Sequence, residues 1–122
     1  MSTDPVVIIG LARTPMGAFQ GAFSTVSAPE LGAAAIKAAM SEANIEGSDI
    51  DQVIMGCVLP AGQGQAPARQ AALGADLPLS AEATTINKMC GSGMQAAIMA
   101  HDAIKAGSIN ICLLYTSDAA DE

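Results

Sequence analysis

Short apolar stretches alternate with helical patterns along the chain. Four β-favouring apolar runs are predicted strands, at residues 6–11, 53–60, 83–87 and from residue 109 onward. The segments between them have the hydrophobic spacing of helices, at residues 28–43, 67–74 and 94–106. The first run is apolar throughout, which predicts a strand buried on both faces. The order β-α-β-α-β-α-β is typical of a mainly parallel sheet with right-handed crossovers, so the predicted fold class is α/β.

The predicted helices begin and end at recognisable capping residues. Ser27 and Glu30 have the spacing of a capping box, with Ser27 as the N-cap of the first helix. Pro67 suits the first turn of the second helix, and Gly74 can end it. Gly107 follows the third helix at the position where a left-handed residue is favoured.

Composition narrows the classes of partner and compartment. The chain has 12 acidic and 5 basic residues without a cluster of Lys or Arg, which disfavours nucleic acid and anionic membrane as partners. No apolar run approaches the roughly 18 residues of a membrane-spanning helix, and Asp4 and Pro5 interrupt any signal-peptide pattern. We therefore expect a cytoplasmic protein. The 3 cysteines lack CxxC spacing, so neither a disulfide framework nor a zinc site is predicted.

Cys90 lies at the predicted junction between a strand and the following helix. Unpaired backbone N–H groups and the positive end of a helix dipole favour the thiolate there, which is the reactive form of cysteine. Gly91 and Gly93 leave room for an acyl group beside the sulfur, and N–H groups in the turn can stabilise an oxyanion. The residues alone leave two alternatives open, a small packing residue and a Gly-rich phosphate site. The phosphate site is the weaker alternative because the GxGxxG spacing and the P-loop lysine are both absent.

Three segments resemble one enzyme family, in the family's order. Residues 87–96 read Asn-Lys-Met-Cys-Gly-Ser-Gly-Met-Gln-Ala, and they resemble the nucleophile segment of thiolases of the acetyl-CoA acetyltransferase type. Residues 7–17 resemble the opening strand of that family, and residues 62–71 resemble its second loop and helix. The Cys-Gly-Ser-Gly version is closer to the members that form acetoacetyl-CoA than to the degradative thiolases, where Cys-Ser-Ser-Gly is usual.

The resemblance implies a fold, a reaction and an assembly. The fold would be the N-terminal part of the layered α/β/α/β/α thiolase arrangement, and the full-length protein would be a homodimer or homotetramer. Cys90 would take an acetyl group from acetyl-CoA, and a second acetyl-CoA, deprotonated at its methyl carbon, would attack it. The products would be acetoacetyl-CoA and free CoA, and thiolysis would be the reverse reaction. Coenzyme A thioesters are the substrates, and no metal, cofactor or prosthetic group is implied.

The resemblance covers only part of the chain and of the family's length. It divides the chain into a partial thiolase N-terminal domain at residues 1–111 and a tail at residues 112–122 that departs from the family pattern. We expect this tail to be artefactual or disordered. The chain matches roughly the first third of a typical thiolase, and the family's later histidine and second cysteine belong to the other half. We therefore expect no turnover from this chain alone.

The other residues that carry candidate chemistry are predicted to be structural. His101 is the only histidine, and it follows Cys90 by eleven positions on the same predicted helix, roughly 16 Å away at the helical rise. A general base must come within hydrogen-bond reach, so His101 is expected to be a packing or surface residue. Cys57 and Cys112 lie in no context that matches the family's second cysteine, and both are predicted to be structural.

Three other functions are compatible with the motifs. One is a degradative 3-ketoacyl-CoA thiolase, and another is a ketoacyl-synthase-like condensing enzyme, which the Arg-Thr-Pro and Asn-Lys-Met-Cys-Gly-Ser-Gly segments disfavour. The third belongs to another class, a non-enzymatic α/β thiol protein in which Cys90 senses oxidants. Acetyl transfer to Cys90 would support an acyltransferase, whereas oxidation by peroxide without acylation would support the sensor.

Overall fold

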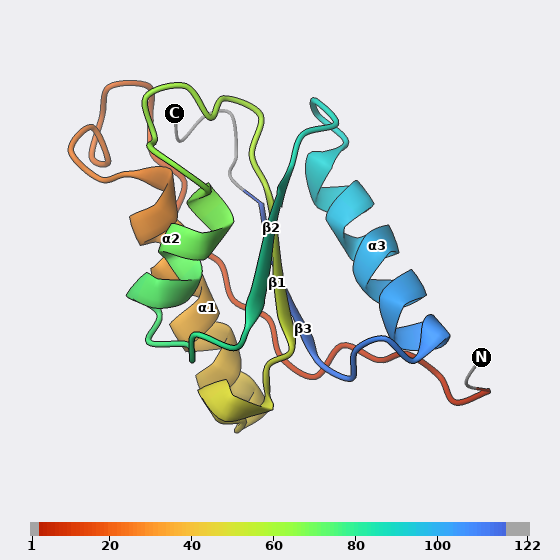
Figure 1. The fold of residues 1–122 in the computed structure, drawn as a ribbon. Coiled ribbons are helices and arrows are strands. Elements are labelled where there is room, and N and C mark those ends of the chain that lie inside the picture. Colours follow the sequence, from red (N-terminus) through yellow and green to blue (C-terminus); the bar gives the residue numbers. More distant parts are fainter. Residues whose placement is uncertain (1–2, 117–122) are drawn as a thin grey trace.

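The computed structural model describes residues 3–116, which form three helices, a short 3₁₀ turn and three strands (Figure 1). In chain order these are α1 (Ala28–Ala43), the 3₁₀ turn (Gly47–Asp49), β1 (Gln52–Gly56), α2 (Pro67–Gly74), β2 (Glu82–Ile86), α3 (Ser92–Ala106) and β3 (Cys112–Thr116). The three predicted helices and the last three predicted strands are confirmed, with β1 and β3 shorter than expected.

The three strands form one parallel sheet in the order β2-β1-β3. The strand ends are aligned, because Gln52 pairs with both Glu82 and Cys112 at the start and Gly56 pairs with Ile86 and Thr116 at the end. Helices α1 and α2 cover one face of the sheet and α3 covers the other (Figure 1). This three-layer arrangement confirms the α/β class with a parallel sheet.

β1 is the central strand, and both of its faces are buried. Val53 and Met55 belong to the core cluster that α1 and α2 build. Ile54 points to the opposite face and packs with Ala96 and Ala100 of α3. Because alternate residues of a strand face opposite sides of a sheet, this small set of side chains joins all three layers. Burial of large aliphatic side chains of this kind contributes about 1.5–3 kcal/mol each.

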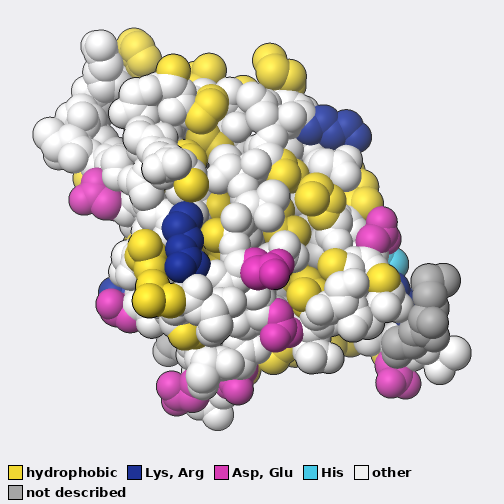
Figure 2. Space-filling model, in the orientation of Figure 1, with side chains coloured by type: hydrophobic (Ala, Val, Ile, Leu, Met, Phe, Trp, Pro, Cys, Tyr) yellow, Lys and Arg dark blue, Asp and Glu magenta, His cyan; other side chains and the backbone are white. Residues whose placement is uncertain are grey.

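The strand predicted at residues 6–11 is wrong. The segment is extended, but it pairs with no strand among the described residues, and Ile8 and Leu11 are 86% and 77% exposed. An apolar groove of about 850 Å³ separates the segment from the outer edge of β3. An apolar run shows that a segment favours burial, but a strand also needs a neighbouring backbone to pair with, and none of β1, β2 and β3 pairs with this segment. Hydrophobic side chains are visible at several places on the face of the molecule in Figure 2.

The helix caps follow the sequence closely. The Ser27 hydroxyl accepts a hydrogen bond from the backbone N–H of Glu30, and the Glu30 carboxylate accepts one from the N–H of Ser27 at 2.8 Å. This is the predicted capping box, which satisfies two donors that the first turn leaves without a helical partner. The hydrogen bonds that the Glu30 carboxylate accepts from the backbone N–H and then the hydroxyl of Ser27 hold the pKa of Glu30 below its ordinary value. Gly107 ends α3 in the left-handed conformation with a φ of 77°, as predicted.

The sequence placed residues 112–116 in a tail, whereas the structure places them in β3. Leu113 belongs to the core, Cys112 and Tyr115 are half-buried, and Leu114 is 43% exposed. The rest of the predicted tail, residues 117–122, lies outside the described residues. Among residues 3–116, no helix is long and apolar enough to cross a membrane.

We expect Asp51 to make the stability of the fold depend on pH. Its carboxylate accepts hydrogen bonds from the backbone N–H groups of Asn110 at 2.6 Å and Ile111 at 3.0 Å, and these bonds lower the pKa of Asp51 from its ordinary value of 3.8. A lowered folded pKa contributes stability above the unfolded pKa, and this contribution is lost as pH falls through the folded pKa. The free energy of unfolding, measured in urea between neutral pH and about pH 3, should therefore fall more steeply for the natural chain than for Asp51→Asn. Parallel curves for the two proteins would contradict this.

Candidate functional site

Cys90 lies in a five-residue loop between β2 and α3, here called the Cys90 loop (residues 87–91). β2 ends at Ile86 at the carboxyl edge of the parallel sheet, which is where ligands bind in folds of this class. The thiol is free and exposed. The structure therefore places Cys90 at a strand-to-helix junction, as predicted, and it does not support the alternative of a buried packing residue.

The backbone of the Cys90 loop is held by a dense set of short hydrogen bonds. Met89 has a φ of 48°, a left-handed conformation that side chains other than glycine adopt infrequently. Its N–H donates to the Asn87 Oδ1 atom at 2.9 Å, and its carbonyl accepts from the Ser92 Oγ atom at 2.6 Å. The Lys88 N–H donates to the same Ser92 Oγ atom at 2.9 Å.

Two further contacts tie the loop to the sheet and to α3. The Asn87 Nδ2 atom donates to the carbonyl of Val58, just beyond β1, at 3.1 Å. The Lys88 Nζ atom donates to the Oε1 atom of Gln95 on α3 at 2.8 Å. The first two residues of the loop thus tie it to the sheet and to α3 through their own side chains.

Gly56 allows the beginning of α3 to approach the end of β1. A Cβ atom built on Gly56 would lie 3.0 Å from both the backbone carbon and the Cβ of Ser92. Contacts of this length are tighter than nine in ten real Cβ contacts, so a side chain at residue 56 would require the start of α3 to shift by a few tenths of an ångström. The close approach brings the N-terminus of α3 over the sheet edge that carries the Cys90 loop.

The first turn of α3 has unused backbone donors beside the loop. Within residues 3–116, the N–H groups of Gly93 and Met94 donate to no acceptor, and no side chain caps the helix. Such donors, together with the helix dipole, attract negative charge. The environment of Cys90 can therefore interact with a thiolate or with an oxyanion that forms next to it.

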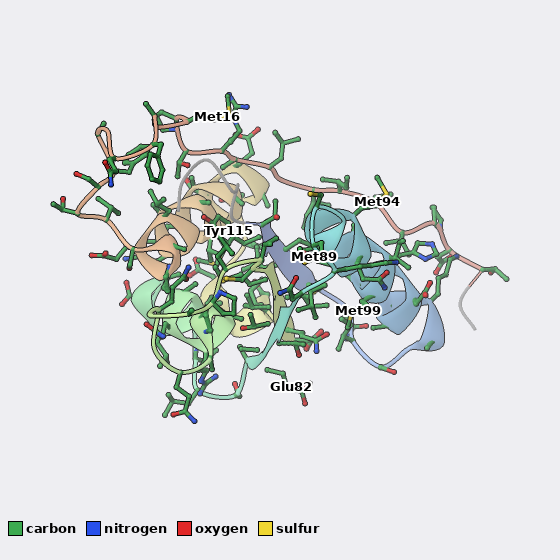
Figure 3. The ribbon with its side chains drawn as sticks, turned by 90° about the horizontal axis from the view of Figure 1, so that it is seen from above. Met16, Glu82, Met89, Met94, Met99 and Tyr115 are labelled. Carbon is green, nitrogen blue, oxygen red and sulfur yellow. The ribbon has the colours of Figure 1, made fainter. Side chains whose placement is uncertain are left out.

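Two exposed methionine side chains lie close to Cys90 in the sequence. Met89 and Met94 are 66% and 75% exposed, and both lie near the N-terminal end of α3 (Figure 3). Methionine side chains are flexible and polarisable, so they can adapt to an acyl chain or to another protein surface.

The other cysteines and the histidine have environments unlike that of Cys90. Cys57 is fully buried behind the end of β1, and its Sγ atom lies 3.9 Å from the Oε1 atom of Gln63. Burial raises the pKa of the Cys112 thiol to about 11, so this thiol stays protonated at neutral pH. His101 lies on the exposed side of α3, where its Nδ1 atom is 3.1 Å from Asp102. These environments agree with the structural roles predicted for the three residues.

Among the described residues, no acidic or imidazole side chain is bonded into the Cys90 loop. Within the described residues 3–116, no three His, Cys, Asp or Glu side chains lie together in a group that could hold a metal ion. The side chains bonded around Cys90 are those of Asn87, Lys88, Ser92 and Gln95, and none of them is a carboxylate or an imidazole.

Comparison with known proteins identifies the family to which this geometry belongs. The family model described as "Thiolase, N-terminal domain" matches residues 6–116. The chain belongs to the thiolase family. The match extends through β3, which is five residues beyond the boundary expected at residue 111.

The similar proteins are named as acetyltransferases. The chain is 51% identical over 106 residues to "Acetyl-CoA acetyltransferase, mitochondrial" from Danio rerio, covering 87% of this chain and 25% of that protein. It is 52% identical over 106 residues to the acetyl-CoA acetyltransferase of Cupriavidus necator, covering 87% and 27%. The solved structure of the acetyl-CoA acetyltransferase from Syntrophomonas wolfei matches with a TM-score of 0.85 and 32% identity, over 88% of this chain and 27% of that one. The chain thus spans about a quarter of the length of these relatives.

Sequence reasoning found Cys90 and the glycines around it but missed Asn87 and Ser92 as the residues that hold the loop. Both stand in the segment that resembles the family, yet their role depends on a turn that brings residues 87 and 92 back toward Met89. A left-handed residue other than glycine gives no clear signal in a sequence. A serine at the first position of the helix was the available sign.

Proposed function

We propose that this chain supplies the nucleophile of a thiolase-type acetyltransferase and that Cys90 carries the acyl group. The observation that carries the proposal is the exposed thiol of Cys90 in a held loop, directly before a helix in which the N–H groups of Gly93 and Met94 donate to no acceptor among residues 3–116. An acyl-transfer site needs a nucleophile that a substrate can reach and donors for the developing oxyanion, and both are present here.

The proposed reaction has two steps that share one intermediate. The sulfur of Cys90 attacks the carbonyl carbon of acetyl-CoA, the bond from that carbon to the CoA sulfur breaks, and CoA leaves with the proton that Cys90 gives up. A second acetyl-CoA then loses a proton from its methyl carbon to a base that residues 3–116 do not supply. The resulting carbanion attacks acetyl-Cys90, a carbon–carbon bond forms, and the bond from the acetyl carbon to the Cys90 sulfur breaks. Acetoacetyl-CoA leaves, and the Cys90 thiolate takes up the proton that the base had removed. Thiolysis runs through the same intermediate in reverse.

The substrates, the assembly and the compartment of the whole protein belong to the same proposal. The names of the relatives support acetyl-CoA as substrate, and thioester chemistry of this kind proceeds without a metal or prosthetic group. We expect the full-length protein to be a homodimer or homotetramer. A cytoplasmic location stays a prediction, since the Danio rerio relative carries "mitochondrial" in its name.

We expect the 122-residue chain alone to show no turnover, because the described residues place no proton acceptor near Cys90. The test is thiolysis of acetoacetyl-CoA, followed by loss of its ultraviolet absorbance, with this chain and with a fusion enzyme. In the fusion enzyme, residues 6–116 of this chain replace the aligned segment of the Cupriavidus necator acetyltransferase, to which the chain is 52% identical. The fusion enzyme should be active. Turnover by the isolated chain would show that it contains its own base.

The same two proteins discriminate between an acyltransferase and a thiol sensor. An acyltransferase forms acetyl-Cys90 from acetyl-CoA. A sensor is oxidised by peroxide to a sulfenic acid or disulfide and accepts no acetyl group. Tests with longer 3-ketoacyl-CoA substrates in the fusion enzyme would reveal a degradative preference.

A further inference from the structure

Ser92 is a polar residue in an otherwise apolar part of the core. Only 2% of its surface is exposed, and within residues 3–116 it is the one polar residue of the buried core. The next buried positions along α3 are Ala96 and Ala100. A buried hydroxyl is unfavourable unless it is hydrogen-bonded. Ser92 therefore stands where alanine would pack equally well, and its two hydrogen bonds need an explanation.

Both hydrogen bonds of the Ser92 hydroxyl go to the Cys90 loop. The hydroxyl donates to the carbonyl of Met89 at 2.6 Å and accepts from the N–H of Lys88 at 2.9 Å. The backbone N–H of Ser92 donates to the same Met89 carbonyl at 3.0 Å. Cys90 lies between the residues that these bonds join, so they fix the path of the chain on which its side chain stands.

The loop contains strain that these bonds stabilise. Met89 has a left-handed φ of 48°, which disfavours a residue with a side chain. Strained conformations persist only where the surrounding structure over-determines them, and they concentrate at functional sites. Here both backbone polar groups of Met89 are bound, the N–H by Asn87 and the carbonyl by Ser92.

We propose that Ser92 is a positioning residue for Cys90, because its hydroxyl bridges Lys88 and Met89 and holds the left-handed turn that presents the thiol at the start of α3. This inference rests on the proposed function, because Ser92 can position Cys90 for acyl transfer only if Cys90 carries the acyl group. A misplacement of about 1 Å at a reacting group can reduce a rate by about 10²-fold. The hydroxyl should therefore act on the chemical step and not on the binding of CoA.

The first test is kinetic and uses the fusion enzyme with Ser92→Ala. We expect kcat to fall by about 10-fold to 100-fold while KM changes by less than about twofold, because Cys90 is displaced but the substrate contacts are not. The matched control is Ala100→Gly, two turns further along the same buried face of α3, which weakens the helix without touching the loop. If Ser92→Ala and Ala100→Gly reduced kcat equally, or if Ser92→Ala left kcat unchanged, the positioning role would be refuted.

The second test is amide hydrogen exchange on the 122-residue chain. In the natural chain the Lys88 amide should be protected, and in Ser92→Ala it should exchange about tenfold faster, as expected for the loss of roughly 1.4 kcal/mol of hydrogen bonding. A Lys88 amide that is unprotected in the natural chain would overturn the proposal, and this measurement needs no variant to fold. The two tests separate the two proposals. If the natural fusion enzyme formed no acetyl-Cys90, the proposed function would fail. If the Lys88 amide still lost protection in Ser92→Ala, Ser92 would nevertheless be shown to stabilise the turn.

Discussion

Replacing Cys90 by serine should reduce the acetyl-transfer rate of the fusion enzyme by at least about 10³-fold. The serine hydroxyl has nearly the same size as the thiol, but it is a much weaker nucleophile at neutral pH because a hydroxyl ionises far less readily than a thiol. The loop should keep its shape, because the bonds that hold it involve Asn87, Lys88, Met89 and Ser92 and not the sulfur. Steady-state thiolysis of acetoacetyl-CoA measures the effect, and circular dichroism checks that the fold is retained.

The matched control for this substitution is Cys112→Ala. Burial keeps the Cys112 thiol protonated at neutral pH, with a pKa of about 11, and Cys112 belongs to β3 and not to the Cys90 loop. Its replacement should remove some packing but leave kcat within a few-fold of the natural value. Full activity in Cys90→Ser, or a larger loss in Cys112→Ala, would assign the nucleophile to another residue.

Replacing Gly56 by valine should both destabilise the fold and impair the site. The new Cβ would lie 3.0 Å from the backbone carbon of Ser92 and 3.1 Å from the nitrogen of Gly93, so α3 must move away from β1. Overpacking of this kind reduces the free energy of unfolding by about 1–3 kcal/mol. Because the side chain would push directly on the start of α3, kcat in the fusion enzyme should fall together with stability. Urea denaturation and thiolysis measure the two effects.

A valine placed nearby at an exposed position provides the control for Gly56→Val. Ala61 lies in the loop after β1 and is exposed, so Ala61→Val should leave both the free energy of unfolding and kcat nearly unchanged. A Gly56→Val protein with natural stability would contradict the close approach of α3 to β1 seen here.

The elements that the sequence predicts well are those whose signals are local. The capping box of Ser27 and Glu30, the Pro67 start of α2 and the Gly107 end of α3 depend on residues only a few positions apart. Cys90 could be placed between a strand and a helix for the same reason. Its chemical environment follows from that junction, since a helix N-terminus has unpaired donors wherever it occurs.

The features that the sequence did not predict depend on distant or conformational partners. Residues 6–11 have the composition of a buried strand, but pairing requires a backbone neighbour, and β3 lies across the apolar groove from them. The hydrogen bonds that stabilise the left-handed Met89 come from Asn87 on one side of the turn and from Ser92 on the other. Hydrophobic periodicity reports neither backbone pairing nor a turn of this kind.

The central claim is that Cys90 carries the acyl group. The most direct test mixes the fusion enzyme with acetyl-CoA, quenches the reaction in acid and measures the mass of the tryptic peptide that contains Cys90. We predict that the peptide containing Cys90 gains the mass of one acetyl group in stoichiometric amount. The gain should disappear after CoA is added in excess, since CoA reverses the transfer. An unmodified Cys90 in a fusion enzyme that is active in thiolysis, or an acetyl group found on Cys57 or Cys112 in its place, would contradict the account.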